Sequence, residues 1–277
     1  MYIYLNGQII KEEEAVISVF DHGFMYGLGL FETFRVYQGH PFLLVDHLHR
    51  LRKGLTELQI QWDVTNEQVV DAIQQILHKN KLQDAYIRLN VSAGPSGLGL
   101  ITEPYKDSTT IIYVKQIPEM VKEKKGVFLK IRRNTPEGSY RLKSHHYLNN
   151  ILGKQEIGQN TELEGIFLTK EGFVAEGIVS NLFWVKDRIV YTPHIETGIL
   201  NGITRQFVLK LLEEAKITYK EGFFSLDDLL SSDEAFITNS IQEIIPLYKI
   251  EHKLFPKSER HITRWLQKKY NELKHIL

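Results

Sequence analysis

Short strand-like segments and helical segments alternate irregularly along this chain, and glycine turns join many of them. Residues 32–38 alternate and are rich in β-branched or aromatic side chains, whereas five leucines between residues 44 and 58 recur at helical spacing. Thr65 and Gln68 have the spacing of a capping box, so a second helix is expected to start at Thr65. This irregular order predicts an α+β fold rather than a doubly wound parallel sheet, which would need regular βαβ units.

The remaining elements follow from the same periodicities. Further strands are expected at residues 85–91, 109–114, 127–132, 165–169, 172–176 and 182–185, and further helices at 144–157, 203–215 and around Trp265.

The length of 277 residues and the hydrophobic content of 43% favour two domains. Residues 116–126 contain a proline and a run of charges without apolar periodicity, so we expect them to connect a smaller N-terminal α/β domain (1–115) to a larger C-terminal domain (127–277). A solvated hairpin is the alternative for the connecting segment.

The composition excludes several kinds of partner. Lys and Arg together number 34, as do Asp and Glu, so no global basic field would draw the chain onto nucleic acid or a membrane surface. No apolar run is long enough to span a bilayer, and the N-terminus lacks a signal-peptide pattern. The absence of cysteine excludes thiolate sites and fits a reducing compartment. We therefore expect a cytoplasmic protein whose partners are small molecules or other proteins.

Two common site motifs are not supported. Gly27-Leu28-Gly29 lacks a third glycine at the dinucleotide-binding spacing, because Glu32 stands there, and a strand rather than a helix follows. His47 and His49 diverge on a predicted helix, so no metal site is expected.

Lys143 lies in a basic stretch that runs from Arg141 to His146. Neighbouring cations and burial make a lysine easier to deprotonate, which a lysine that attacks a carbonyl group requires near neutral pH. Lysines in basic stretches are more often solvated surface residues, and the residues alone favour that interpretation.

Two further segments complete a pattern with Lys143. Glu176 ends a short predicted strand and enters a glycine turn, where its carboxylate could keep a pyridine nitrogen protonated; an exposed turn glutamate is the alternative. At Asn201-Gly202-Ile203-Thr204 the first turn of a helix could bind a phosphate through its backbone N–H groups; an ordinary helix cap is the alternative.

In this order the three segments resemble the class IV, or fold-type IV, family of aminotransferase-like enzymes. The resemblance runs from Asp21-His22-Gly23 through Asn239-Ser240, nearly the whole chain. It implies a two-domain fold like that of D-amino acid aminotransferases, pyridoxal 5′-phosphate as cofactor and a homodimer. It also implies that Lys143 forms the Schiff base and that Glu176 contacts the pyridine nitrogen.

The resemblance assigns further cofactor contacts. They are Ile203, Thr204, Asn239, Ser240 and Arg50 for the phosphate, and Tyr147 for the phenolic oxygen. Without the resemblance, Arg50 is interpreted as a solvated flank of the leucine-rich helix, and Tyr147 as a core or interface residue.

The N-terminal half indicates which reaction the family resemblance implies. Leu98 and Leu100 stand where D-amino acid aminotransferases carry an Arg-x-His pair for the substrate carboxylate. Thr33, within Phe-Glu-Thr-Phe-Arg, matches the aminodeoxychorismate lyases, in which a threonine assists proton transfer. The resemblance therefore implies a lyase of folate biosynthesis that converts 4-amino-4-deoxychorismate to 4-aminobenzoate and pyruvate, with Lys143 as general base.

Several alternatives stay open at this stage. Thr33 could be an ordinary strand residue, since threonine favours strands. Arg35 and Arg88 are candidates for the two substrate carboxylates, and a structural ion pair is equally possible for Arg88. The alternative activity is a class IV aminotransferase acting on D-amino or branched-chain amino acids, and a non-enzymatic binder is the alternative from another class.

Overall fold

The computed structural model describes all 277 residues and divides into two compact units. The first unit comprises Met1–Pro118, Leu142–His146 and Lys274–Leu277, and the second comprises Glu119–Arg141 and Tyr147–Leu273. No helix is both long enough and apolar enough to cross a membrane.

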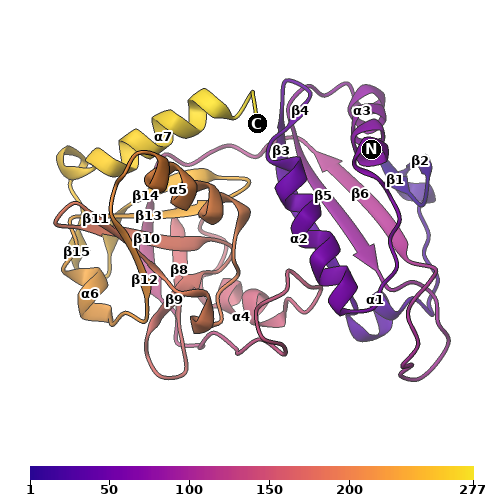
Figure 1. The fold of residues 1–277 in the computed structure, drawn as a ribbon, viewed down its shortest axis with the longest axis horizontal. Coiled ribbons are helices and arrows are strands. Elements are labelled where there is room, and N and C mark those ends of the chain that lie inside the picture. The colour runs from indigo at the N-terminus through magenta and orange to yellow at the C-terminus, as the bar shows by residue number, and fades with distance from the viewer. The chain divides into compact units, whose positions relative to one another are not determined.

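The first unit is built on a six-stranded antiparallel sheet with the order β2-β1-β6-β5-β3-β4 (Figure 1). Its elements are β1 (Tyr2–Leu5), β2 (Gln8–Lys11), η1 (Glu12–Glu14), α1 (His22–Tyr26), β3 (Gly29–Tyr37), β4 (His40–Pro41), α2 (Leu44–Glu57), α3 (Asn66–Asn80), β5 (Ala85–Ser92) and β6 (Thr109–Lys115).

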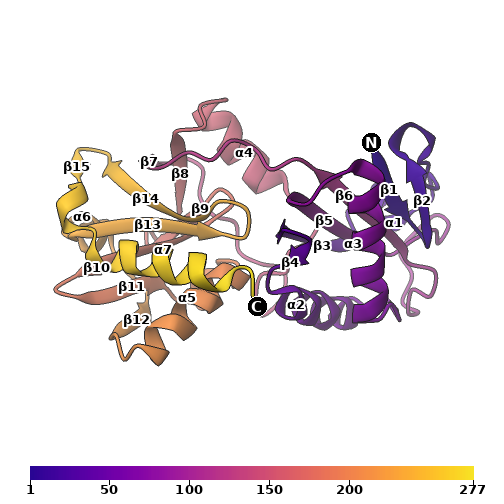
Figure 2. The same ribbon diagram turned by 90° about the horizontal axis from the view of Figure 1, so that it is seen from above.

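Helices α2 and α3 cover one face of this sheet (Figure 2). Successive side chains of a strand point to opposite faces, so Leu30, Phe34 and Val36 of β3 enter the core together with the leucine stripe of α2. Each fully buried leucine contributes about 2 kcal/mol by leaving water. The opposite side chains of β3 are left to the other face of the sheet, where the candidate site begins.

The predicted start of α3 is confirmed. The Thr65 hydroxyl accepts a hydrogen bond from the Gln68 N–H at 3.3 Å, and the Gln68 side chain accepts one from the Thr65 N–H at 2.8 Å. This capping box satisfies backbone donors that the first helical turn leaves without partners.

The second unit contains a nine-stranded mixed sheet with the order β12-β11-β10-β13-β14-β7-β8-β9, in which β15 also pairs with β14. Its elements are β7 (Lys124–Phe128), α4 (Leu148–Ile157), β8 (Leu163–Leu168), β9 (Val174–Gly177), β10 (Asn181–Lys186), β11 (Ile189–Pro193), η2 (Ile195–Thr197), α5 (Ile203–Glu214), β12 (Tyr219–Gly222), α6 (Leu226–Leu230), β13 (Glu234–Asn239), β14 (Glu243–Ile250), β15 (Lys253–Leu254), η3 (Lys257–Glu259) and α7 (His261–Leu273).

The α+β class predicted from the sequence is confirmed. The first sheet is antiparallel, and in the second only the pairs β11–β12, β14–β7 and β7–β8 are parallel. Regular βαβ repetition, which a doubly wound fold requires, does not occur.

The domain limits differ from those expected in three places. Lys124 and Lys125 belong to β7, because Lys124 pairs with a buried glutamate and is not solvated. Lys143 was expected in the C-terminal domain, but Leu142–His146 belongs to the first unit. Lys274–Leu277 also joins the first unit, where the Leu277 carbonyl accepts the Leu43 N–H at 3.0 Å.

Two local boundaries also differ from the prediction. The helix expected from residue 144 begins at Leu148, because Ser144 forms a bridge with Leu30 and the residues on either side of it bond to the start of β3. The strand expected over residues 127–132 is β7, which starts at Lys124 and ends at Phe128.

Candidate active site

One candidate group of residues lies on the face of the first sheet opposite α2 and α3. Phe31, Thr33 and Arg35 alternate along β3 with the core residues, so they share this face. On the neighbouring strand β5, Arg88 lies directly across from Thr33 and Asn90 across from Phe31. Alternation along β3 predicted that Thr33 and Arg35 share this face, and the pairing of β3 with β5 adds Arg88 to them.

Lys143 lies beside this face because its segment pairs with the start of β3. The Phe31 N–H donates to the Lys143 carbonyl at 3.0 Å, and the His145 N–H donates to the Gly29 carbonyl at 3.0 Å. The Lys143 Nζ lies 4.3 Å from the centroid of the Phe31 ring. The lysine is partly buried, which departs from the solvated surface position that its basic stretch alone would suggest.

Arg88 and His145 complete the surroundings of Phe31. The Arg88 guanidinium carbon lies 3.9 Å from the ring centroid, and its Nε donates to the Asn90 side chain at 2.9 Å. Burial, together with the charge of Arg88, lowers the pKa of His145 to about 4, so this imidazole is neutral near neutral pH. Arg88 therefore contacts the Phe31 ring and the Asn90 amide. The two Nη groups of its guanidinium remain available to bind a carboxylate.

Arg50 is held by a buried carboxylate on the other face of β3. Its Nε and Nη2 donate to Glu32 at 2.7 and 2.6 Å, and His47 Nδ1 donates to the same carboxylate at 2.6 Å. Burial opposes ionisation of Glu32, but the charges and hydrogen bonds of Arg50 and His47 lower its pKa to about 2. Burial also lowers the pKa of His47, although Glu32 acts in the opposite direction. Arg50 is therefore an oriented side chain, not a solvated flank.

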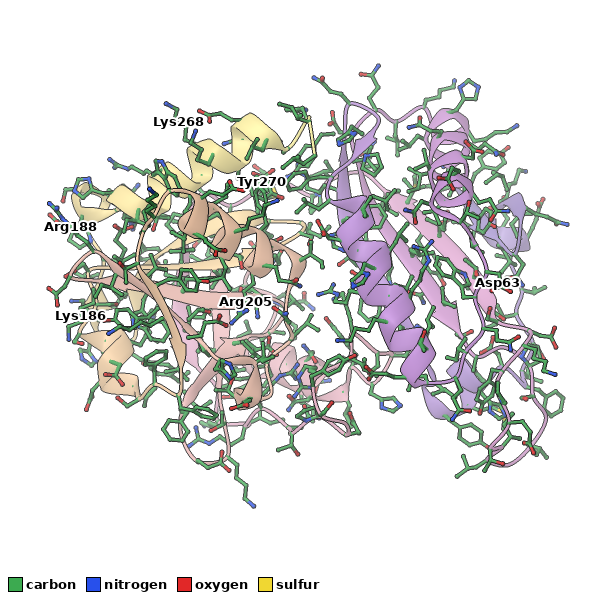
Figure 3. All side chains as sticks on the ribbon, viewed as in Figure 1. Asp63, Lys186, Arg188, Arg205, Lys268 and Tyr270 are labelled. Atoms are coloured by element: carbon green, nitrogen blue, oxygen red, sulfur yellow. The ribbon has the colours of Figure 1, made fainter.

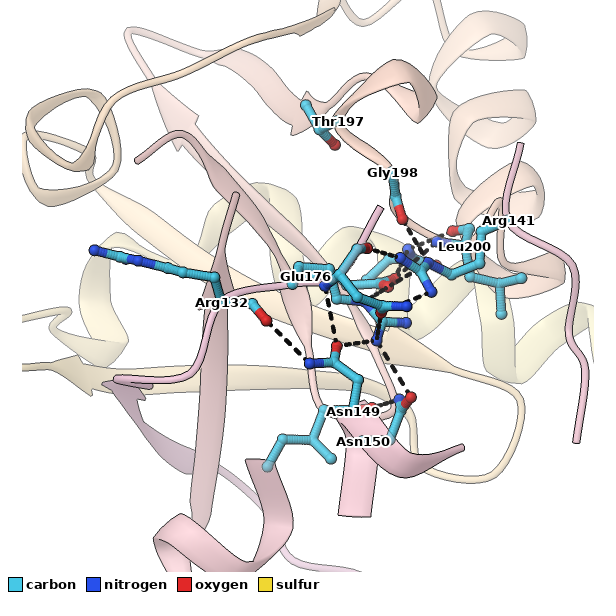
Figure 4. A network of polar contacts seen from close by, with 12 residues as sticks. Arg132, Arg141, Asn149, Asn150, Glu176, Thr197, Gly198 and Leu200 are labelled. Carbon is cyan, nitrogen blue, oxygen red and sulfur yellow. Dashed lines mark hydrogen bonds and ion pairs between the residues drawn. The ribbon is translucent and has the colours of Figure 1, made fainter. Parts of the chain in front are cut away.

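Glu176 is the centre of a second group of residues, in the second unit (Figure 4). The carboxylate is buried and accepts hydrogen bonds from Arg133 Nε at 2.8 Å, the Leu200 N–H at 3.0 Å and Asn181 Nδ2 at 3.3 Å. It is therefore not the exposed turn glutamate that was the alternative. A carboxylate has about four acceptor positions, so capacity remains for one further donor such as a protonated ring nitrogen.

Arg141 adds a second cation to this group. Its Nε lies 3.8 Å from Glu176 Oε1 and donates to the Gly198 carbonyl at 2.5 Å. Burial and the nearby charge of Arg133 lower the pKa of Arg141 to about 10, while the charges of Glu176 and Tyr147 act in the opposite direction. The predicted residue Tyr147, which precedes α4, thus belongs to the surroundings of Arg141.

The first turn of α5 has the features of an anion site. Gly202 precedes the helix and provides no side-chain cap, so the N–H groups of Ile203 and Thr204 lack intrahelical partners. A Cβ atom on Gly202 would lie 2.2 Å from Asn181 Oδ1, so a larger residue here would displace the Asn181 side chain. The buried Thr204 hydroxyl lies 3.3 Å from the Ser240 hydroxyl, which brings together two predicted phosphate contacts.

Arg205 fixes the position of this helix start from inside the second unit (Figure 3). Its guanidinium donates to Asn201 Oδ1 at 3.1 Å and to the Pro193 carbonyl at 3.0 Å, and it pairs with Glu221. These contacts connect α5 to β11 and β12, so the first turn of the helix is anchored at two points.

The turn between β13 and β14 supplies Ser240. Asn239 Oδ1 accepts the N–H groups of Ile241 and Gln242 at 2.9 and 2.7 Å, so the Asn239 side chain stabilises the turn itself. One residue earlier, the buried Thr238 Oγ1 has no hydrogen-bond partner. A buried hydroxyl without a partner is costly, and a ligand oxygen at this turn would satisfy it.

The residues of the second unit fit a phosphorylated pyridine. Its pyridine nitrogen would meet the carboxylate of Glu176, and its phosphate would meet the backbone of Ile203 and Thr204 with the hydroxyls of Thr204 and Ser240. The first unit, taken by itself, contains an amine that could form a Schiff base, Lys143, and an oriented cation, Arg50. Both units therefore contain side chains of the kind that pyridoxal 5′-phosphate requires.

Three residues of these networks were missed by the sequence interpretation. Arg133 follows another arginine in the sequence, and nothing local distinguishes the two. In the structure Arg132 is exposed and Arg133 is buried. Asn149 and Asn150 accept from Arg133 Nη1 at 2.6 and 3.2 Å. The two adjacent asparagines in the predicted helix were the available signal, but Arg133 lies 16 and 17 residues away from them in the sequence.

Comparison with known proteins places these features in a family. The model of the family described as amino-transferase class IV matches residues 29–250. The chain is 47% identical, over 99% of its length and 96% of the relative, to an aminodeoxychorismate lyase from Bacillus subtilis (strain 168).

Two solved structures match nearly the whole fold. A 4-amino-4-deoxychorismate lyase from Pseudomonas aeruginosa has a TM-score of 0.88 and 25% identity, with 98% of each chain covered. A branched-chain amino acid aminotransferase from T.th., complexed with N-(5′-phosphopyridoxyl)-L-glutamate, has a TM-score of 0.85 and 26% identity, with 98% of this chain and 93% of that chain covered.

The matched range covers both candidate groups, from β3 to β14, and the matching structures have the same fold-type IV architecture. The chain therefore belongs to the class IV aminotransferase family of pyridoxal 5′-phosphate-dependent enzymes.

Proposed function

We propose that this enzyme is a lyase that converts 4-amino-4-deoxychorismate to 4-aminobenzoate and pyruvate. The observation that carries the proposal is the sheet face of the first unit opposite α2 and α3, where Lys143 lies over Phe31 and Thr33 is the next side chain on that face. The 47% identity with an aminodeoxychorismate lyase supports the same reaction.

The loop after β5 also favours the lyase. Leu98 and Leu100 are strongly exposed apolar side chains, so this loop offers no charge at those two positions for an α-carboxylate. The amine of 4-amino-4-deoxychorismate stands on a ring carbon that bears no carboxylate. The substrate therefore does not need the carboxylate contact that a D-amino acid requires.

The cofactor contacts in this proposal follow the two groups of residues. Lys143 is the point of covalent attachment, and Glu176 keeps the pyridine nitrogen protonated. The phosphate contacts are Arg50, Ile203, Thr204, Asn239 through its backbone, and Ser240, and Tyr147 is the contact for the phenolic oxygen. Bound pyridoxal 5′-phosphate supplies an electron-poor ring that stabilises negative charge at the substrate carbon.

Proton transfer is the task of Lys143 and Thr33. Lys143 Nζ acts as general base and removes the proton from the amine-bearing ring carbon of the substrate. The C–O bond to the enolpyruvyl group on the neighbouring carbon then breaks, and the ring becomes aromatic. Lys143 Nζ or Thr33 Oγ1 returns a proton to the departing enolpyruvate, which becomes pyruvate.

The substrate carries two carboxylates, and the sheet face offers two arginines for them. Arg88 stacks on Phe31, and Arg35 lies with its guanidinium carbon 4.6 Å from the Tyr37 ring centroid. An arginine held against a ring loses freedom of orientation, which favours bidentate recognition of a carboxylate by its planar guanidinium group.

A homodimer in the cytoplasm is part of the same proposal. Large apolar side chains of the first unit are exposed, among them Val16, Val19, Phe24, Leu98 and Leu100. Exposed apolar surface of this kind is typical of a protein–protein contact, here with a second copy of the chain. Light scattering of the purified protein should give twice the mass of the chain, and a monomeric mass would contradict the dimer.

The reaction is tested by supplying the cofactor-loaded protein with 4-amino-4-deoxychorismate in the absence of any 2-oxo acid. Equimolar 4-aminobenzoate and pyruvate, formed over many turnovers, are expected. If product forms from D-amino or branched-chain amino acids only when a 2-oxo acid is added, and none forms from 4-amino-4-deoxychorismate, the enzyme is an aminotransferase instead.

A further inference from the structure

A buried ion pair lies between the two turns that carry the proposed cofactor contacts of the second unit. Lys124 Nζ donates to Glu164 Oε2 at 2.9 Å, and both side chains are more than nine-tenths buried. This pair touches none of the proposed cofactor contacts, and the mechanism above does not use it.

One end of the pair holds the turn that follows Glu176. Glu164 Oε1 accepts the Ser180 hydroxyl at 2.8 Å, and the Gly177 N–H donates to the Ser180 carbonyl at 2.8 Å. A Cβ atom on Gly177 would lie 2.1 Å from Ser180 Oγ and 2.4 Å from Glu164 Oε1, so a larger residue would displace both side chains. Glu164 thus fixes the turn that begins at Gly177, the residue directly after Glu176.

The other end holds the turn that carries Ser240. Lys124 Nζ also donates to Gln242 Oε1 at 3.1 Å, and Asn239 Nδ2 donates to the same oxygen at 3.3 Å. The Gln242 side chain therefore joins the lysine to the turn whose Ser240 hydroxyl lies near Thr204.

The order of the strands explains why this pair can reach both turns. Strand β7, which begins at Lys124, lies between β14 on one side and β8 on the other. The Ser240 turn leads into β14, and β8 pairs with β9, which ends at Gly177. A side chain at the start of β7 is therefore placed between the two turns.

We propose that Lys124 and Glu164 are positioning residues that set the spacing between the pyridine contact, Glu176, and the phosphate contact, Ser240. The proposal rests on the proposed function, because it concerns the same cofactor. A buried ion pair contributes little net stability compared with a well-packed apolar pair, since desolvation offsets its attraction. The pair acts instead through its hydrogen bonds to Ser180 and Gln242, which hold the two turns in place.

The test separates cofactor affinity from stability. The double variant Lys124→Met/Glu164→Leu removes both charges and all hydrogen bonds of the pair, whereas Glu164→Gln removes one charge. The matched control is Glu234→Gln, at the far end of β13, where the buried carboxylate accepts the Thr263 N–H at 2.8 Å and its hydroxyl at 2.6 Å. Each protein is stripped of cofactor, its melting temperature is measured, and it is titrated with pyridoxal 5′-phosphate.

The double variant should melt near the wild-type temperature and bind the cofactor roughly tenfold more weakly, the loss expected for misplaced hydrogen bonds to charged groups. Glu164→Gln should lose affinity as well, and Glu234→Gln should lose stability but bind within about twofold of wild type. If the double variant does not fold, Glu164→Gln against the control decides the outcome.

Cofactor binding at wild-type affinity by both pair variants would overturn the proposal. So would an affinity loss in Glu234→Gln as large as theirs, because the effect would then follow stability alone. A wild-type protein that itself fails to bind pyridoxal 5′-phosphate would instead contradict the proposed function.

Discussion

Glu32 in the first unit and Glu176 in the second are both buried glutamates that accept a hydrogen bond from an arginine. Their arginines differ in exposure. The side chain of Arg50 is 18% exposed beside Glu32 at 1%, whereas the side chains of Arg133 and Glu176 are 4% and 5% exposed. At Glu32 the arginine is thus the more accessible partner, and at Glu176 the carboxylate is as accessible as its arginine.

This difference separates two uses of the same pair of residue types. Glu32 orients Arg50, and in the proposed function its influence on the cofactor acts through the arginine. Arg133 and Arg141 orient Glu176, and in the proposed function the carboxylate is the group that contacts the cofactor. A buried glutamate is therefore not by itself a sign of a cofactor contact, because at Glu32 the arginine is the more exposed side chain of the pair.

The largest expected effect is that of Glu176→Gln. Without the negative charge the pyridine nitrogen is no longer kept protonated, so turnover at saturating cofactor should fall roughly a thousandfold. Steady-state formation of 4-aminobenzoate measures the effect. Glu32→Gln is the control in the same assay and should retain most of its turnover. Equal losses of turnover in the two variants would contradict the different roles given to the two glutamates.

The pH dependence of stability should single out Glu32. Its folded-state pKa is lowered from 4.5 to about 2, so the unfolded state binds a proton at a higher pH than the folded state. The stability due to this group is therefore present above about pH 4.5 and is lost as the pH falls toward 2. Over the full window the loss is on the order of 3 kcal/mol.

Denaturant unfolding of the wild type and of Glu32→Gln across this pH window measures that contribution. The free energy of unfolding of the variant should fall less steeply with decreasing pH. Parallel curves for the two proteins would show that the carboxylate of Glu32 is not ionised against Arg50 in the folded state.

A smaller effect is expected for Glu32→Gln on cofactor affinity. Without the two charged hydrogen bonds to Glu32, Arg50 can take other orientations. The dissociation constant of pyridoxal 5′-phosphate should therefore rise roughly tenfold. Titration of the cofactor-free protein measures it. Pyridoxal, which lacks the phosphate, should bind the wild type and the variant alike, and an equal loss for pyridoxal would place the effect away from the phosphate.

The smallest effect is expected for Tyr147→Phe. A single hydrogen bond to the phenolic oxygen is worth about 1 kcal/mol, so cofactor affinity should fall no more than about fivefold. The absorbance spectrum of the bound cofactor should shift at the same time. An unchanged spectrum together with a lowered melting temperature would identify Tyr147 as a packing residue near Arg141.

Local patterns were sufficient for the elements whose cause is local. The leucine stripe of α2 and the capping box at Thr65 are short-range features, and both were predicted correctly. The pairing of residues 142–146 with β3 joins segments more than 100 residues apart and has no local signature, which is why a helix was expected to start at residue 144. Lys124 was assigned to a solvated connection because its partner Glu164 is 40 residues away.

In the candidate site, too, features with a local cause were predicted and features with a long-range cause were missed. Alternation along β3 correctly predicted that Thr33 and Arg35 share a face. The sequence suggested Glu176, but its surroundings depend on Arg133 and Arg141, which approach from another part of the chain. Long-range electrostatic partners of this kind follow from the fold and cannot be derived from spacing in the sequence.

The central claim is that Lys143 carries the cofactor, and chemical trapping tests it directly. The cofactor-loaded protein is reduced with borohydride and digested, and the peptide that bears the phosphopyridoxyl group is identified by mass spectrometry. The account predicts one modified lysine per chain, Lys143, and no modification in Lys143→Ala. Modification of a different lysine in the wild type, or of none, would contradict it.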